Sequence, residues 1–240
     1  MAKNNDELFK NVISHAKEYG FVFPSSEIYD GLSAVYDYGE YGAELKNNIK
    51  SYWWKSMVQM NENIVGLDSA IFMHPKIWKA SGHVDGFNDP MIDNKDSKKR
   101  YRADQLLEDK IAKYEKDGKT AKAEKLQADM DAALKSDNLN QLRDLIIEHE
   151  IACPVSGTRN WTDVRQFNLM FSTQFGAMAE GSEEVYLRPE TAQGIFVNFL
   201  NVQKTARMKI PFGIAQIGKA FRNEVIARQF IMRMREFEQM

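Results

Sequence analysis

The stretches FGIAQIGKAFRNEV at residues 212–225 and FIMRMREFEQM at residues 230–240 decide the fold, because each alternates in residue type as a strand does. Alternate side chains of a strand share a face. One face of the first strand then carries small residues followed by a charged pair: Gln216, Gly218, Ala220, Arg222 and Glu224. One face of the second strand carries Arg233, Arg235 and Phe237. A short connection over about residues 225–230 would join the strands into an antiparallel hairpin.

The charged face of this hairpin suits a nucleoside triphosphate. Arginine presents a rigid fork that binds phosphate oxygens and keeps its charge. An aromatic ring such as Phe237 can stack on adenine, and a carboxylate such as Glu224 can accept from the exocyclic amino group. The plainer alternative is an edge hairpin with alternating surface charges, and spacing alone favours that alternative.

Composition points to an ordinary globular protein. The 240 residues are 43% hydrophobic and 28% charged, which allows one large domain or two small ones. A net charge of −2 excludes a broadly basic nucleic-acid binder. The single Cys153 excludes an internal disulfide framework and fits a reducing compartment. No apolar run approaches a membrane span. These features together predict a cytoplasmic enzyme with no membrane partner.

Further along the chain, hydrophobic periodicity predicts helices at 6–20 and 43–60 and a buried strand at 64–73. Residues 103–150 are rich in Lys, Glu, Asp and Ala, contain no Pro and one Gly, and predict two or three helices with seams near 117–118 and 136–138. In RPETAQG at 188–194, Pro189 fits a first helical position and Glu190 the first turn. Taken alone, Glu190 reads as a helix-start residue.

Several of these stretches resemble one family. FRNE at 221–224, with RMREF at 233–237, is similar to motif 2 of class II aminoacyl-tRNA synthetases, and RPETAQG resembles glycyl-tRNA synthetases. The stretch at 20–39 resembles the N-terminal platform of that family, LKNNIKSYWWKSM at 45–57 its motif 1 helix, and DSKKRYRADQLL at 96–107 a further stretch. Glu40 stands where the family usually has Pro. The two tryptophans, Trp53 and Trp54, fit either a dimer interface or the core.

The resemblance implies an α+β fold, an antiparallel sheet flanked by helices, with residues 1–240 forming the N-terminal part of a class II catalytic domain. Residues 103–150 would be a helical insertion in it. We expect the match to end inside motif 2, with motif 3 and the C-terminal anticodon-binding domain absent from these residues. CPVSG at 153–157 looks like a Cys-Pro-x-Cys-Gly unit with Ser156 in place of the second Cys, so a zinc site there lacks ligands.

The resemblance also assigns site residues. Arg222 would be catalytic, on the α-phosphate and the amino acid carboxylate, and Arg233 or Arg235 would reach the γ-phosphate. The implied ATP-binding set is Arg222, Asn223, Glu224, Met232, Arg233, Met234, Arg235, Glu236 and Phe237. Glu190 would hold the substrate ammonium. The implied glycine-binding set is Arg102, Glu190, Phe237, Glu238, Gln239 and Met240. Mg²⁺ would accompany ATP, with no metal ligand from the chain.

The implied activity is ATP-dependent activation of glycine to glycyl-adenylate and transfer to glycine tRNA, by a homodimer assembled through motif 1. We expect these 240 residues alone to be inactive. The alternative is a synthetase-like binding or dimerisation protein that has lost catalysis. Such a protein has no need of ATP-binding charges, so Arg222, Glu224 and Phe237 favour an enzyme.

Overall fold

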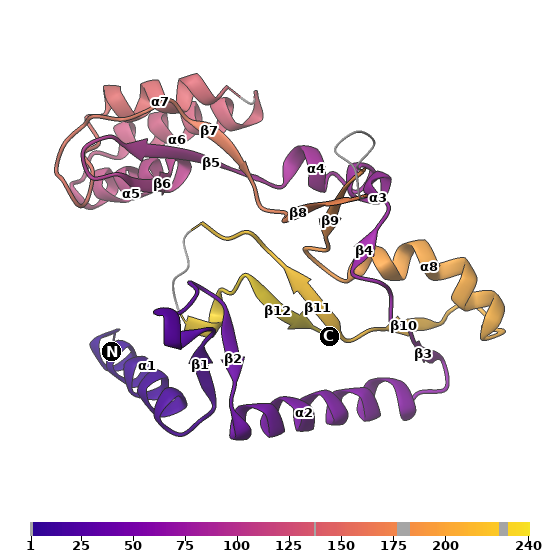
Figure 1. The fold of residues 1–240 in the computed structure, drawn as a ribbon. Helices are drawn as coiled ribbons and strands as arrows, with labels where there is room; N and C mark the ends of the chain where they lie inside the picture. Colours follow the sequence, from indigo (N-terminus) through magenta and orange to yellow (C-terminus); the bar gives the residue numbers. More distant parts are fainter. Residues whose placement is uncertain (1, 137, 177–182, 226–229) are drawn as a thin grey trace. The chain divides into compact units, whose positions relative to one another are not determined.

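The computed structural model describes residues 2–136, 138–176, 183–225 and 230–240, which divide into two compact units (Figure 1). The first unit comprises Met1–Asp85 and Leu169–Met240, and the second comprises Gly86–Asn168. Each unit contains both helices and mainly antiparallel strands, which confirms the α+β class. Within the described ranges, no helix is both long and apolar enough to cross a membrane.

The N-terminal part of the first unit contains two helices around a small hairpin. Helix α1 spans Ala2–Glu18, so it starts four residues before the predicted position. Strands β1 (Val22–Pro24) and β2 (Tyr36–Tyr38) pair antiparallel on either side of a 3-10 turn, η1 (Glu27–Tyr29). Helix α2 (Glu40–Trp54) continues as a π-helical turn, η2 (Lys55–Gln59), which confirms the predicted long helix. Glu40 opens α2, where a carboxylate suits the helix dipole.

The prediction of one strand at 64–73 is wrong, because the chain changes sheets there. Strand β3 (Ile64–Gly66) pairs in parallel with β10 (Gly213–Ala215). Strand β4 (Phe72–Met73) pairs antiparallel with β9 (Glu183–Leu187), and β9 also pairs with β8 (Ser172–Phe175). Between the two strands, Ser69 O and Ser69 Oγ accept hydrogen bonds from Nη1 of the buried Arg188, and the strand pairing is interrupted there. Helices α3 (Pro75–Ala80) and α4 (His83–Gly86) follow.

The C-terminal hairpin forms as predicted but is shorter. Strands β11 (Gly218–Phe221) and β12 (Glu236–Gln239) pair antiparallel, with Ala220 opposite Phe237. The predicted continuous first strand is wrong, because β10 leaves to join β3 and the chain breaks at residues 216–217. The return strand starts only at Glu236, after a 3-10 turn, η3 (Phe230–Met232). Residues 226–229 of the predicted connection lie outside the described residues.

Helix α8 (Ala192–Thr205) begins later than predicted, with Thr191 as its N-cap. Pro189 and Glu190 therefore precede the helix instead of forming its first turn. The reason is that the backbone oxygens of Arg188 and Pro189 accept hydrogen bonds from Phe221 of β11 and from Arg222, the residue after it. Phe221 N donates to Arg188 O at 2.9 Å, and Arg222 Nε donates to Pro189 O at 3.2 Å.

The second unit combines a three-stranded antiparallel sheet with three helices. The sheet has the order β6 (Lys99–Arg102), β5 (Asn88–Asn94), β7 (Arg165–Asn168). Helices α5 (Ala103–Lys116), α6 (Thr120–Lys135) and α7 (Leu139–Glu148) confirm the predicted helices and their seams. One apolar core joins helices and sheet, and its most deeply buried members include Ile92, Leu107, Leu126, Leu142 and Ile146.

Candidate active site

A cavity of about 410 Å³ in the first unit brings together residues from α2, the start of α8, β10 and β12. Three members of the predicted glycine-binding set line it: Glu190, Gln239 and Met240. Trp53 lines the same cavity, and Trp54 packs over Gly66. Neither tryptophan therefore belongs to the row of exposed apolar side chains on α2, which consists of Leu45, Ile49 and Tyr52. The cavity therefore combines a carboxylate with mainly apolar walls.

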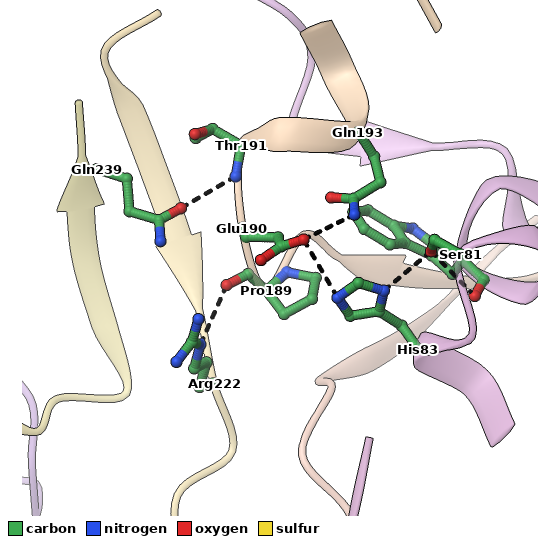
Figure 2. Close-up of polar contacts among 9 residues, drawn as sticks. Ser81, His83, Pro189, Glu190, Thr191, Gln193, Arg222 and Gln239 are labelled. Atoms are coloured by element: carbon green, nitrogen blue, oxygen red, sulfur yellow. Dashed lines mark hydrogen bonds and ion pairs between the residues drawn. The ribbon is translucent and has the colours of Figure 1, made fainter. Parts of the chain in front are cut away.

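The Glu190 carboxylate is held by two side chains at one oxygen (Figure 2). Gln193 Nε2 donates to Glu190 Oε1 at 2.7 Å, and His83 Nε2 lies 3.4 Å from the same atom. Next to it, Thr191 N donates to Gln239 Oε1 at 3.0 Å, which ties the start of α8 to β12. The structure thus brings Glu190 and Gln239 to the same wall.

Arg222 and Phe237 lie on one face of the hairpin, as their positions in the two strands predict. Arg222 Cζ is 5.3 Å from the centroid of the Phe237 ring, and its Nε donates to Pro189 O. Since Pro189 adjoins Glu190, the arginine is fastened to the segment that carries the carboxylate (Figure 2). The face offers a permanent cation, an aromatic ring and a floor of small residues, which suit a phosphate and a planar base.

The acidic residues of β12 point their side chains away from this face, because adjacent residues of a strand alternate. Glu238 Oε1 and Oε2 each lie 3.3 Å from a lysine of α2, Lys50 and Lys46 respectively. Glu236 pairs with Lys219. In this structure both carboxylates pair with lysines instead of pointing toward the face that carries Arg222 and Phe237. The assignments of Glu236 to ATP and of Glu238 to glycine stay predictions.

Of the two arginines predicted for the γ-phosphate, Arg235 donates hydrogen bonds to backbone carbonyl oxygens. Its Nε donates to Glu224 O and its Nη1 to Ser33 O, both at 3.0 Å. Arg233 is exposed and lines a separate cavity of about 280 Å³ with Lys17.

Three other members of the predicted ATP-binding set, Asn223, Met232 and Met234, have different surroundings. Asn223 N donates to Leu169 O at 2.7 Å. Met232 is exposed, and Met234 lines an apolar groove next to α2.

Arg102 belongs to the second unit. It pairs with Asp104 at 2.6 Å and with Asp89 at 3.2 Å. The hydrogen bond to Asp104 raises the pKa of Arg102, burial opposes this, and the charges of both carboxylates add to the rise. Its predicted contact with glycine stays a prediction.

Three residues of the site were not singled out from sequence. Arg188 is buried, and it donates to Lys219 O at 2.6 Å and to Ser69 O at 2.8 Å. Burial lowers the pKa of Arg188, and the charge of Asp68 acts against that effect. Gln193 lies three residues after Glu190 inside RPETAQG, a spacing that could have indicated contact. His83 had no local signal.

The second unit holds the Cys153 thiol in a polar setting. Its Sγ lies 3.2 Å from Tyr101 Oη and 3.3 Å from Ser97 Oγ. Burial acts to raise the pKa of this thiol, but hydrogen bonds with Ser156, Ser97 and Tyr101 outweigh it and lower the pKa to about 6. Among the residues that the structure describes, no group of three or more His, Cys, Asp and Glu side chains could hold a metal ion.

Comparison with known proteins adds sequence relationships to this geometry. A family model described as glycyl-tRNA synthetase insertion domain 1 matches residues 89–125 and 117–169. A glycine–tRNA ligase of Chlorobaculum tepidum is 56% identical over 230 residues, 95% of this chain and 49% of that protein. The Macrococcus caseolyticus enzyme of the same name is 53% identical over 240 residues, 100% of this chain and 48% of that protein. The chain thus spans about half the length of these curated relatives.

Proposed function

The chain belongs to the glycyl-tRNA synthetase family, and from this premise we propose that it takes part in ATP-dependent activation of glycine and transfer to tRNA. The observation that carries the proposal is the fastening of Arg222 to the Glu190 segment. Arg222 reaches Pro189 O while it lies over Phe237, and Glu190 lines the adjoining cavity. The contact of Arg222 with the residue next to Glu190 supports the proposal that the guanidinium binds a phosphate and the carboxylate binds an ammonium group at one site.

In the proposed reaction, a glycine carboxylate oxygen forms a bond to the α-phosphorus of ATP as the bond to pyrophosphate breaks. No general base is needed, because a carboxylate is already ionised at neutral pH. Arg222 would neutralise charge that develops on the phosphoryl oxygens, and Glu190 would hold the ammonium so that the carboxylate points at phosphorus. Mg²⁺, carried on the ATP phosphates, would supply further neutralisation.

The proposed architecture is the class II catalytic fold, with α2 as motif 1 and the β11–β12 hairpin as motif 2. Leu45, Ile49 and Tyr52 of α2 are exposed by 49%, 48% and 76%. Such a row of apolar side chains supports the proposal of a homodimer interface.

Glycine-dependent exchange of pyrophosphate into ATP tests this function in the full-length protein that carries the chain. We expect exchange with glycine and none with alanine or serine at equal concentrations. Equal exchange with serine would contradict the glycine assignment. ATP binding without exchange for any amino acid would indicate instead a synthetase-like protein that has lost catalysis.

A further inference from the structure

We propose that His83 is a positioning residue for Glu190. Together with Gln193 it holds Oε1 of the carboxylate, so that Oε2 is presented to the ammonium group of the substrate. This inference rests on the proposed function, since it gives His83 a role in glycine recognition. It concerns only residues of the first unit.

Two donors approach the same oxygen from different elements. Gln193, near the start of α8, is 7% exposed and donates through Nε2, because a carboxylate can only accept. His83, at the start of α4, brings Nε2 to 3.4 Å from that atom (Figure 2). Within the described part of the chain, no hydrogen bond or ion pair reaches Oε2. The Glu190 side chain is 31% exposed, so its second oxygen stays open to a ligand in the cavity.

The imidazole of His83 is itself fixed from behind. Its Nδ1 lies 2.9 Å from Ser81 Oγ, and Ser81 Oγ lies 3.3 Å from the carbonyl oxygen of Trp78. The ring packs edge-to-face on the fully buried Trp78, with centroids 5.5 Å apart and planes at 74°. If the Ser81 hydroxyl donates to Nδ1, the neutral ring carries its proton on Nε2, toward Glu190. If the hydroxyl donates to Trp78 O, it accepts from Nδ1–H, and Nε2 carries a proton only in the charged ring.

This arrangement matters because Glu190 lies before the first residue of helix α8, where no helical turn restrains its side chain. A carboxylate held at one oxygen meets the substrate ammonium in one orientation, and the ordering cost is met before binding. A freely rotating carboxylate would bind the same cation less tightly. His83 should therefore affect glycine affinity and leave ATP affinity nearly unchanged.

Two substitutions at one position separate positioning from packing. His83→Phe keeps an aromatic ring against Trp78 but removes the donor to Glu190. His83→Gln restores an N–H donor at a similar reach and gives up the ring. In the full-length protein, we expect His83→Phe to raise the KM for glycine about tenfold, as loss of one charge-assisted contact does, with the KM for ATP within about threefold. We expect His83→Gln to recover most of the glycine affinity. Melting temperatures of both variants report folding.

A double-mutant cycle with Glu190→Gln tests whether His83 acts through the carboxylate. Glu190→Gln alone should raise the KM for glycine at least about tenfold, because it removes the charge that pairs with the ammonium. In that background His83→Phe should add little. Full additivity would overturn the positioning role, as would an unchanged glycine KM in His83→Phe or an equal loss in both His83 variants. An unchanged glycine KM in Glu190→Gln alone would instead overturn the proposed function of this site.

Discussion

The guanidinium of Arg188 occupies the space above Gly218, where a β-carbon would meet Nη2 closer than two heavy atoms can approach. Arg188 cannot easily yield, because its other nitrogens donate to Lys219 O and Ser69 O. We therefore expect Gly218→Ala to destabilise the chain by about 1–3 kcal/mol, the range for added bulk in a packed interior. Urea unfolding of the purified chain measures this.

Gly86→Ala is the matched control for that substitution. A β-carbon there meets no heavy atom within 4 Å, and its φ is not in the left-handed region. It should change stability by no more than about 0.5 kcal/mol. Equal stability of the two variants would show that Arg188 moves aside.

Arg222 is expected to act on the transition state. Its contacts include the backbone carbonyl of Pro189 and the face of the Phe237 ring. Arg222→Ala in the full-length protein should slow glycine-dependent pyrophosphate exchange about a hundredfold, or about 3 kcal/mol, by analogy with loss of one oxyanion donor. Arg222→Lys keeps the charge but not the fork and should fall in between. Near-normal exchange in Arg222→Ala would remove it from the proposed mechanism.

The sequence pattern predicted those helices and strands that depend on residues close together in the chain. The three helices between residues 103 and 150 follow from a composition rich in Lys, Glu, Asp and Ala and from the breaks near Gly118 and Ser136. The hairpin follows from alternation of side chains, which also placed Arg222 and Phe237 on one face.

The misplaced elements have long-range causes. Ser69 Oγ donates to Gln216 Oε1 across 147 positions of sequence, and both residues lie where a predicted continuous strand is broken. Arg188 also donates to the backbone oxygens of Ser69 and Lys219, which fixes the start of RPETAQG, and helix α8 begins only after Glu190. No periodicity within 212–225 or 64–73 reports such contacts. His83 escaped prediction for the same reason, since only the fold brings it to Glu190.

The Cys153 thiol predicts a pH dependence of stability. Its pKa is lowered from 9.0 to about 6 in the folded chain, so the folded state binds its proton more weakly than the unfolded state. The stabilisation is then complete above about pH 9 and is lost as pH falls through about 6. In urea unfolding under reducing conditions, the advantage of the wild type over Cys153→Ala should grow from pH 6 to pH 9. A pH-independent difference would show that the thiol does not titrate in this range.

The last prediction concerns the exposed row on α2. Leu45 and Ile49 are one helical turn apart, so they share a face, and both line an apolar groove of about 510 Å³ with Val12 and Met234. If this face is the proposed homodimer interface, Ile49→Glu places an unpaired charge in it and should raise the dimer dissociation constant at least about tenfold. Light scattering of the purified chain over a concentration series measures the change.

Asn47→Glu supplies the control, because it adds the same charge to an exposed position two residues away, on a different side of the helix. Net charge alone would affect both variants equally, whereas an interface through Leu45 and Ile49 predicts dissociation only for Ile49→Glu. Thermal melts must show that both variants stay folded, since Ile49 also contributes to the groove wall. If Ile49→Glu leaves the molecular mass measured by light scattering unchanged, any self-association uses another surface, and α2 is not the homodimer interface.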